Sequence, residues 1–454
     1  MSNPSGRNLA QLVLDRIEQR ASYINLALPE VLDEFPEADR REKAFCTELV
    51  YGVYRHLLKI DYFLGRLLCR PLSSLKIPVK NSLRIALYQL LYLPEIPERA
   101  VCYSAVEQIK NSRYQGLAPL VNGVLRAYLR NKNNLAVPEK EPGQYLSIEY
   151  SHPRWLVERW LERFGPELTV KILTADNELP PLTLRVNRHS AAIAAVLQEL
   201  KTDGAGYSPG NWLAEAVNIS SLPGPIEELT AFAAGRIFVQ DESAMLVSHL
   251  LAPMPGETII DLCAAPGGKS THLAELMNDR GEVISVDDHP HKIALIAGNA
   301  RRLQLTIIKP TLGDARHFSM PGGMLADAVL VDAPCTGTGV LRRRVDARYR
   351  RKPEDIVNLA KIQQEILDQA AKLIRPGGRL VYSTCTLEPE EDQEQVESFL
   401  KSHPQFETAD FRPYLPEAVL QYAPDPEERR WLTILPVTGG GDGFFMCRLE
   451  RRYS

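Results

Sequence analysis

The second half of the chain repeats a pattern of short apolar runs, turns and helical stretches, and this repetition constrains the fold most strongly. The apolar runs are almost uninterrupted, whereas a strand with one solvated face alternates apolar and polar residues. Buried strands of this kind, separated by helices, predict a parallel sheet with helices on both faces. The predicted strands are residues 258–263, 282–287, 328–332 and 379–384. We therefore expect an α/β, Rossmann-like domain over 236–454, with ligands at the carboxyl ends of its strands.

The first half of the chain has a different pattern. Apolar residues recur at helical spacing, as at Leu9 and Val13, and Pro and Gly fall between such runs rather than within them. This pattern predicts an all-α domain over residues 1–140. Residues 141–235 combine helical stretches with an alternating, β-branched run at 182–187, which predicts a small α+β module.

Cysteine usage and hydropathy indicate the compartment. The 454 residues include seven scattered cysteines, and no pair has the Cys-x-x-Cys spacing of a zinc site or redox motif. We expect free thiols in a reducing cytosol and no metal centre. The first residues lack the apolar core of a signal peptide, and no apolar run reaches the roughly 18 residues of a membrane span. The sequence therefore predicts a cytoplasmic protein away from membranes, and nothing in it requires more than a monomer.

Charge is unevenly distributed along the chain. Residues 1–140 contain 20 Lys and Arg against 14 Asp and Glu, a net charge of +6, whereas the whole chain carries −4. A basic N-terminal segment on an acidic protein permits a nucleic-acid partner. A helical domain with solvated Lys and Arg side chains explains the same charge equally well.

A Gly-rich turn after the first predicted strand indicates a cofactor. Asp261-Leu-Cys-Ala-Ala-Pro-Gly-Gly-Lys269 joins that strand to a helix, whose free N–H groups can meet a ligand. The turn is not a P-loop, because Cys263 stands where that motif needs Gly. Asp287 ends the next strand and can accept hydrogen bonds from ribose hydroxyls, and Asp314 can meet the adenine edge. Acidic groups in these places favour an adenosine ligand without a heavy phosphate demand, and S-adenosylmethionine fits best.

Two cysteines follow later strands, in Asp332-Ala-Pro-Cys335 and in Ser-Thr-Cys385. A thiolate that adds to C6 of a pyrimidine makes C5 nucleophilic enough to take a methyl group, and elimination of the thiol completes the reaction. Lys269 and the cofactor sulfonium are candidates for lowering the pKa of the attacking thiol, and Asp332 can hold the N3 side of the ring. The chemistry alone leaves open which thiol attacks. A base within RNA must leave its stack to reach these groups.

A strongly basic run follows the first of these cysteines. Seven of the eleven residues in 342–352 are Lys or Arg. Beside a base-modifying site, this run predicts contacts with RNA phosphates. The alternative is a solvated basic helix start.

These residues resemble the bacterial RNA cytosine-C5 methyltransferases, specifically the Sun/Fmu (RsmB-type) enzymes that act on 16S rRNA. The motifs that carry the resemblance are Phe238-Val-Gln-Asp-Glu-Ser243, Asp261 to Lys269, Asp332-Ala-Pro-Cys335 with Gly339-Val-Leu-Arg-Arg343, Ser383-Thr-Cys385 and Asp442-Gly-Phe-Phe445. Leu49-Val-Tyr-Gly-Val-Tyr-Arg55 and Asn122-Gly-Val-Leu-Arg126 resemble, more weakly, a NusB-like domain. The resemblance implies a multidomain fold: an all-α NusB-like RNA-binding domain, a small α+β RNA-binding module and a class I methyltransferase domain.

The resemblance also implies roles for individual residues. In this family the Thr-Cys thiol attacks the base and the Pro-Cys thiol helps to release the product, so Cys385 attacks and Cys335 releases, with Asp332 and Lys269 completing the catalytic set. The implied product is 5-methylcytosine in 16S rRNA, which makes the protein an rRNA-processing transferase. The implied S-adenosylmethionine pocket consists of Cys263, Ala264, Ala265, Pro266, Gly267, Gly268, Lys269, Asp287, Asp314 and Asp332.

Two rival interpretations remain open at this point. One is a tRNA-directed cytosine-C5 methyltransferase built on the same catalytic domain, which a comparison of tRNA and 16S rRNA as methyl acceptors would separate. The other is a non-catalytic RNA-binding assembly or antitermination factor led by the NusB-like domain. A pure binder requires neither the two thiols nor the acidic set, and it would not bind the cofactor in a calorimeter.

Overall fold

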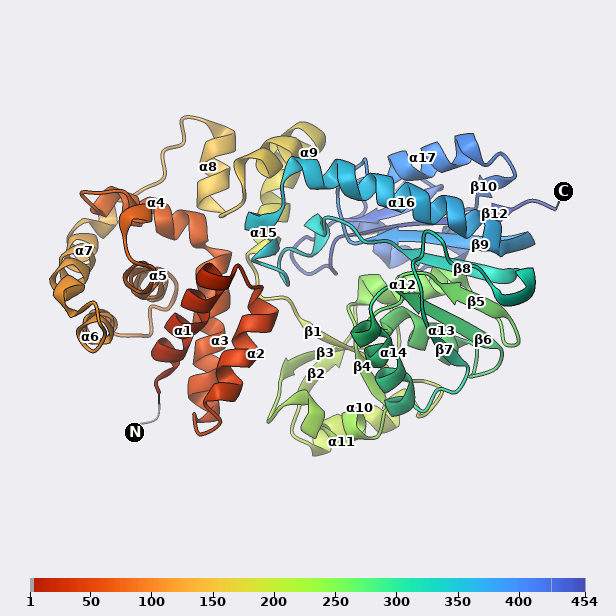
Figure 1. The fold of residues 1–454 in the computed structure, drawn as a ribbon, viewed down its shortest axis with the longest axis horizontal. Coiled ribbons are helices and arrows are strands. Elements are labelled where there is room, and N and C mark those ends of the chain that lie inside the picture. Colours follow the sequence, from red (N-terminus) through yellow and green to blue (C-terminus); the bar gives the residue numbers. More distant parts are fainter. Residues whose placement is uncertain (1–3, 426, 454) are drawn as a thin grey trace. The chain divides into compact units, whose positions relative to one another are not determined.

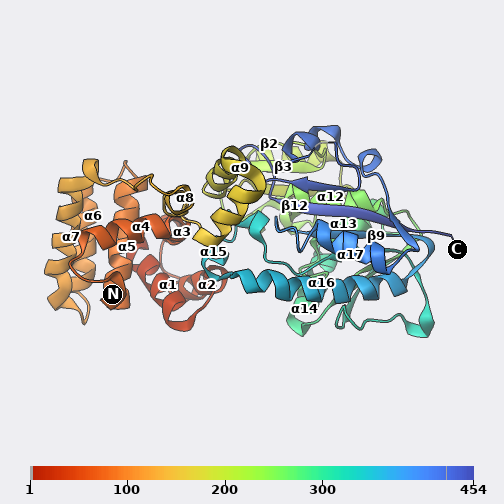
Figure 2. The same cartoon turned by 90° about the horizontal axis from the view of Figure 1, so that it is seen from above.

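The structure is a computed structural model that describes residues 4–425 and 427–453. The chain forms two compact units, which we describe separately (Figure 1; Figure 2). The first, here the helical unit, extends to Asn177 and also includes Arg344–Arg350. The second, here the catalytic unit, contains Glu178–Arg343 and the chain from Arg351 onward. In the described part of the chain, no helix is both long and apolar enough to cross a bilayer.

The helical unit is built from amphipathic helices. Two of them begin at a capping residue: the Ser5 and Asp39 side chains accept hydrogen bonds from the backbone of the first turns of α1 and α3. The helices are α1 (Gly6–Arg20), α2 (Ile24–Glu34), α3 (Arg40–Arg55), α4 (Leu57–Leu67), α5 (Ile77–Tyr92), α6 (Glu98–Lys110), α7 (Ala118–Asn131), α8 (Pro142–Glu149), α9 (Arg154–Asp176) and the short α15 (Ala347–Arg350).

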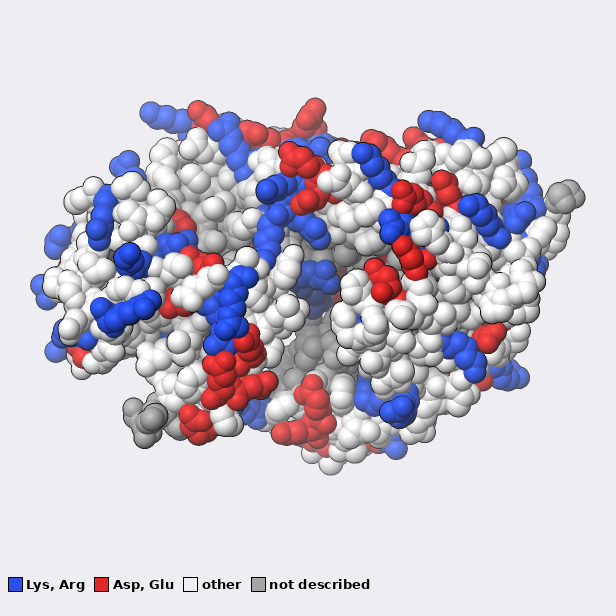
Figure 3. Space-filling view, in the orientation of Figure 1, with Lys and Arg blue, Asp and Glu red and all other residues white. Residues whose placement is uncertain are grey.

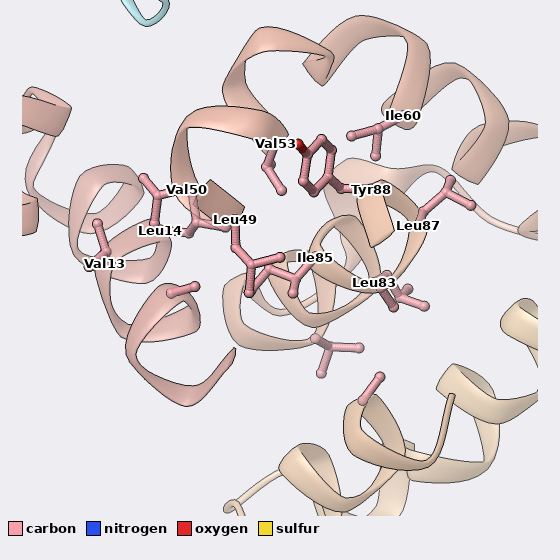
Figure 4. Close-up of a cluster of buried hydrophobic side chains, with 14 of the residues drawn as sticks. Val13, Leu14, Leu49, Val50, Val53, Ile60, Leu83, Ile85, Leu87 and Tyr88 are labelled. Atoms are coloured by element: carbon pink, nitrogen blue, oxygen red, sulfur yellow. The ribbon is translucent and has the colours of Figure 1, made fainter. Parts of the chain in front are cut away.

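The core of the helical unit lies where α1, α3 and α5 meet. Figure 4 shows the contributing side chains, which include Val13, Leu49 and Leu87. Gly52 of α3 permits this packing, because a Cβ at its position would lie 2.0 Å from Cζ of Tyr88. Gly within a helix costs about 1 kcal/mol relative to Ala, and here it lets the tyrosine ring lie directly against the helix backbone.

A segment from far along the sequence completes the helical unit. Arg348 is 1% exposed, and its guanidinium donates to the carbonyl oxygens of Arg55 and Asp176 and to Oδ1 of Asn177. The Tyr349 hydroxyl donates to backbone carbonyls of the same unit. The basic run 342–352 is therefore not a freely solvated helix start, and the expected RNA contact is wrong for Arg348.

The compact helical unit extends beyond residue 140, where the sequence predicts the end of the all-α domain. Helices α8 and α9 belong to the helical unit, where the Ser151 hydroxyl between them accepts a hydrogen bond from the Lys59 backbone at 3.2 Å. Residues 137–143 thus lie within the compact helical unit. Pro142 and Gly143 stand in the first turn of α8.

The catalytic unit begins with a four-stranded antiparallel sheet in the order β2-β3-β1-β4. The predicted strand at 182–187 is β1, and the last strand lies just beyond the predicted boundary at 235 because it pairs with β1. The elements are β1 (Leu182–Val186), α10 (Ile193–Thr202), β2 (Gly206–Pro209), β3 (Ala216–Ser221), α11 (Thr230–Ala233) and β4 (Ile237–Val239).

An eight-stranded sheet follows, with β11 paired to β12 beside the path β10-β12-β9-β8-β5-β6-β7. The strands from β9 to β7 are parallel, as predicted, whereas β10, β11 and β12 form an antiparallel extension that was not predicted. The strands are β5 (Thr258–Asp261), β6 (Glu282–Asp287), β7 (Ile308–Leu312), β8 (Ala326–Asp332), β9 (Ile374–Thr384), β10 (Phe406–Thr408), β11 (Trp431–Ile434) and β12 (Phe444–Arg451).

Helices cover both faces of this sheet, and each face has its own apolar core. Residues of α12, α13 and α14 pack on one face, and residues of α16 and α17 pack on the other (Figure 1). The strand order reverses between β5 and β8, and such a switch point is where ligands of open α/β sheets bind. The helices are α12 (Glu242–Leu251), α13 (Gly268–Leu276), α14 (Pro290–Arg302), α16 (Pro353–Leu373) and α17 (Gln393–Ser402).

A buried histidine makes the helical unit sensitive to acid. His152 is fully buried, its Nδ1 lies 2.7 Å from the Tyr150 carbonyl oxygen and its Nε2 lies 3.2 Å from Oδ2 of Asp176. Burial lowers the pKa of His152 to about 4. The unfolded chain therefore binds a proton on His152 below about pH 6.5, whereas the folded chain binds it only below about pH 4. The folded protein loses stability as the pH is lowered through this window.

We expect His152 to account for about 2 kcal/mol of the stability lost between about pH 7.5 and about pH 5. Urea unfolding followed by helical circular dichroism at both pH values measures this loss. In the His152→Gln variant the loss should be smaller by that amount, even if the variant is less stable at neutral pH. An identical pH dependence in the two proteins would contradict the assignment.

Candidate active site

The predicted site residues lie at the carboxyl ends of the parallel strands. Asp261 ends β5, Asp287 ends β6, Asp332 ends β8, and Cys385 directly follows β9. Because β5 and β8 are neighbours at the switch point, their ends form one edge with that of β9. The sheet thus brings together residues that are more than 120 positions apart in the sequence.

The two predicted thiols face each other. Sγ of Cys335 lies 3.4 Å from Sγ of Cys385, and both side chains are partly accessible. The hydrogen bond to the Cys385 thiol and burial raise the pKa of Cys335 well above its ordinary value. Two sulfurs this close do not ionise together, so one of them keeps its proton beside the other.

Lys269 and Asp332 form an ion pair at the same edge. Nζ of Lys269 lies 2.7 Å from Oδ2 of Asp332, and the Ser383 hydroxyl donates to Oδ1 at 2.9 Å. The Lys269 ammonium also lies 5.1 Å from the centre of the Phe444 ring. Lys269 was one of two candidates for lowering the pKa of the attacking thiol, and its amine binds Asp332. Lys269 therefore helps to fix the orientation of the Asp332 carboxylate, since Lys269 and Ser383 each donate to a different oxygen of it.

The Gly-rich turn joins β5 to α13, as the sequence predicts for a strand and a helix. Gly267 has φ 101° directly before α13, a backbone conformation that favours glycine. The backbone N–H of Ala265 donates to Oδ2 of Asp287 at 3.2 Å, so the turn and the end of β6 form one assembly. Nζ of Lys292 also lies 3.0 Å from Oδ1 of Asp287.

The other acidic residues of this edge have different surroundings. Asp261 is buried and accepts a hydrogen bond from the Ser270 hydroxyl, and burial raises its pKa to about 7. Asp314 follows Gly313, whose N–H donates to the Asp287 carbonyl oxygen at 3.0 Å, and this places it beside the end of β6. A hydrogen bond from Arg316 lowers the pKa of Asp314. Cys263 packs against the apolar core on one face of the sheet, and burial raises the pKa of its thiol well above its ordinary value.

The basic run is also committed to protein contacts at its two ends in the catalytic unit. Nε of Arg342 and Nε of Arg343 each lie 2.6 Å from a carboxylate oxygen of Asp442, and Arg343 also binds Asp241 at 2.7 Å. Arg351 donates to the carbonyl oxygen of Thr336 at 2.9 Å. Acidic and carbonyl groups of the protein thus bind these three arginines, whereas Arg344 and Lys352 of the same run are exposed and remain the predicted phosphate contacts.

The same interactions explain several motifs. Asp241 and Asp442 belong to the Phe238–Ser243 and Asp442–Phe445 motifs, and both clamp the loop that carries Cys335. Gly339 and Gly443 let two loops touch, because a Cβ on Gly339 would lie 2.4 Å from the Gly443 carbonyl oxygen. These residues hold the site rather than perform chemistry.

Sequence reasoning missed one group next to the thiols. It consists of Thr336, Thr338, Thr386, Glu391 and Gln363, which form a buried hydrogen-bond network behind both cysteines. One signal was available, since a threonine directly follows each cysteine. The Glu391 carboxylate gave no signal, because Glu388-Pro-Glu-Glu-Asp392 has the composition of an exposed turn.

Comparisons with known proteins identify the family. Residues 248–450 match the family model of the 16S rRNA methyltransferase RsmB/F, residues 5–130 match the NusB family, and residues 152–226 match an RsmF/B-like ferredoxin-like domain. The chain resembles a probable ribosomal RNA small subunit methyltransferase B of Bacillus subtilis, with 40% identity over all of both chains. It also resembles the ribosomal RNA small subunit methyltransferase B of Klebsiella pneumoniae, with 34% identity over 98% of each chain.

Solved structures support the same assignment. A crystal structure titled PH0851 is 26% identical, has a TM-score of 0.81, and the match covers 99% of this chain and all of that one. A methyltransferase homologue from Pyrococcus horikoshii is 25% identical, with a TM-score of 0.57 over 67% of this chain and 97% of that one. The predicted resemblance and fold class are confirmed. The chain belongs to the ribosomal RNA small subunit methyltransferase B family, with a NusB domain, a ferredoxin-like domain and a methyltransferase domain in one chain.

Proposed function

We propose that this protein transfers a methyl group from S-adenosylmethionine to C5 of a specific cytosine in 16S rRNA, through a covalent adduct between a cysteine sulfur and C6. The observation that carries the proposal is the pair of thiols 3.4 Å apart at the carboxyl ends of β8 and β9, beside the Lys269–Asp332 pair. An RNA-binding factor without catalysis requires neither feature. The membership in a 16S rRNA methyltransferase family supports the substrate.

The residues of the Gly-rich turn suit an adenosine cofactor. Gly267 has a positive φ, and a Cβ on Gly268 would lie 3.2 Å from the Phe238 ring, so the two glycines let the turn take its shape and pack closely on its neighbours. Asp287 stands at the end of β6, the place for a carboxylate that binds ribose hydroxyls. We propose that residues 263–269, Asp287, Asp314 and Asp332 hold the cofactor. When bound, S-adenosylmethionine supplies an electrophilic methyl group on its sulfonium.

The chain's own residues perform the remaining chemistry. We assign the attack on C6 to Sγ of Cys385, and this attack makes C5 electron-rich. We assign to Asp332 the binding of the N3 side of the ring, in the orientation that Lys269 and Ser383 fix. After methylation, the C5 proton passes to a base such as water, the C5=C6 double bond re-forms and the Cys385 sulfur leaves C6 as a thiolate, which can take up the proton that the Cys335 thiol holds. Sγ of Cys335 lies 3.4 Å from that leaving sulfur and assists the release.

The helical unit contributes a surface that suits RNA. A groove of about 660 Å³ between α6 and α7 is lined by Arg99, Lys110 and Arg126 and also by Glu98 and Glu107, so basic side chains outnumber acidic ones by one. Figure 3 shows Lys and Arg side chains over the part of the helical unit where Figure 1 places these helices. We propose that the helical domain and the α+β module bind rRNA, chiefly through its phosphates.

One experiment tests the function. The purified protein is incubated with methyl-labelled S-adenosylmethionine and either unmodified 16S rRNA or tRNA, and 5-methylcytosine is mapped by bisulfite sequencing. A single new site in 16S rRNA is the expected result. Label in tRNA alone would retain the chemistry and reject the substrate, and no label in either RNA would reject the enzyme.

Replacing Asp287 should weaken cofactor binding. Each hydrogen bond from a ribose hydroxyl to a carboxylate contributes about 1.5–3 kcal/mol, so we expect the Kd of S-adenosylmethionine to rise about 10- to 100-fold in Asp287→Ala. Calorimetric titration measures the Kd directly. Asp288→Ala is the matched control, because its half-exposed side chain binds His289 and shares Lys292 with Asp287, so the control removes a carboxylate that contacts the same lysine. Equal losses in the two variants would contradict the assignment of Asp287.

A further inference from the structure

A single buried carboxylate connects the two loops that carry the cysteines. Glu391 is 0% exposed and lies between β9 and α17. Its Oε1 accepts hydrogen bonds from the Thr336 backbone N–H at 2.9 Å and from Gln363 Nε2 at 3.0 Å. Its Oε2 accepts from the Thr336 hydroxyl and from the Thr386 hydroxyl at 3.1 Å. Four donors therefore converge on one side chain.

The donors come from the residues next to the thiols. Thr336 directly follows Cys335, and Thr386 directly follows Cys385. Their hydroxyl oxygens lie 2.8 Å apart, so the two loops also touch each other at this point. Any shift of the Glu391 carboxylate would displace both cysteine backbones, one residue away in each case.

Further hydrogen bonds make the connection rigid. The Gly339 N–H donates to the Cys385 carbonyl oxygen at 3.0 Å, and Gln363 also donates to the Pro334 carbonyl oxygen at 2.9 Å. Burial of a carboxylate is unfavourable, and burial raises the pKa of Glu391. Burial of this carboxylate therefore costs free energy. Because both of its oxygens accept hydrogen bonds from the two cysteine loops, it holds these loops in a fixed geometry.

We propose that Glu391 is a positioning residue, which sets the separation and direction of the Cys335 and Cys385 sulfurs for attack on the base and release of the product. This role rests on the proposed methyl transfer. Glu391 need not touch the substrate, because it acts through Thr336 and Thr386. A displacement of about 1 Å at a reacting group can reduce a rate about 100-fold.

The role predicts a division between rate and binding. In Glu391→Ala we expect kcat to fall about 100-fold, while the Kd of S-adenosylmethionine changes less than about twofold. Glu391→Gln should recover most of the rate, because its oxygen can face the two N–H donors and its amide can donate to the two threonine hydroxyls. Glu394→Ala, on the exposed side of α17, is the matched control and should retain the wild-type rate.

Single-turnover measurements test the proposal at the step concerned. The rate of covalent RNA adduct formation is compared in Cys335→Ala and in Cys335→Ala with Glu391→Ala, and the second protein should form adduct about 100-fold more slowly. Thr386→Val removes one link without a carboxylate change and should slow the reaction about 10-fold, so the test survives if Glu391→Ala does not fold.

The outcomes separate this proposal from the proposed function. If the wild-type protein methylates 16S rRNA and Glu391→Ala retains more than about a third of kcat, positioning by Glu391 is wrong and the function stands. Equal losses of cofactor binding, folded fraction and rate, without rescue by Glu391→Gln, would show a merely structural role. If the wild-type protein methylates no RNA, the function itself fails.

Discussion

The Cys385→Ala variant is expected to lose both methyl transfer and the covalent adduct with RNA. C5 of cytosine is too weak a nucleophile to take a methyl group unless a thiolate has added at C6. No neighbouring group replaces the lost sulfur, since Cys335 is the partner 3.4 Å away that retains its proton. We expect turnover to fall at least about a thousandfold, as on removal of other catalytic nucleophiles.

Labelled methyl transfer and denaturing electrophoresis with 16S rRNA measure the two losses together. The Kd of S-adenosylmethionine should stay within about twofold of the wild-type value, because the cofactor turn lies on β5 and β6 rather than on β9. Cys69→Ala is the matched control, since Cys69 is exposed and lies in the helical unit. An adduct formed by Cys385→Ala would reverse the assigned roles of the two cysteines.

The parts of the fold that the sequence predicted are those with a local pattern. Buried parallel strands appear as continuous apolar runs, so β5, β6, β8 and the second half of β9 were predicted close to their observed bounds. The antiparallel edge was missed, because β12 reaches its place only by pairing with β9, about 70 positions earlier. Its sequence, Phe444-Phe-Met-Cys-Arg-Leu-Glu-Arg451, carries no mark of that partner.

The surroundings of the basic run 342–352 could not be predicted for the same reason. A run with seven basic residues in eleven is usually solvated, but Arg348 is buried by carbonyl oxygens of Arg55 and Asp176 that no local pattern reveals. Arg342 and Arg343 both pair with Asp442, about 100 positions later, and Arg343 also pairs with Asp241, about 100 positions earlier. Composition gives the charge of a segment, but tertiary contacts decide whether that charge faces a partner.

The candidate site also contains residues that could be predicted from local sequence and residues that could not. Its motif residues could be predicted, because each sits at the end of a strand and strand ends of a parallel sheet meet at one edge. The supporting shell could not, because Glu391 meets Thr336 across 55 positions and looks like a surface acid in the sequence. The local motif thus identifies the chemistry, whereas the residues that hold the two sulfurs at 3.4 Å emerge only from the fold.

The Cys335→Ala variant is expected to give the opposite result to Cys385→Ala, namely accumulation of the RNA adduct. Attack by Cys385 and methylation of C5 should proceed, because neither step needs the Cys335 sulfur. Release requires loss of the C5 proton as the bond between C6 and the Cys385 sulfur breaks, and Cys335 is the sulfur beside that bond.

Removal of a group that assists proton transfer typically slows a step by about 10²–10⁴-fold, so release becomes rate-limiting and turnover falls by a similar factor. The adduct should then approach one RNA per protein, survive denaturation and disappear on ribonuclease treatment. The Cys335→Ala, Cys385→Ala double variant is the decisive control, since it should form no adduct. If Cys335→Ala turns over at the wild-type rate without adduct, release does not depend on Cys335, and the pairing of the two thiols serves the structure of the loops instead.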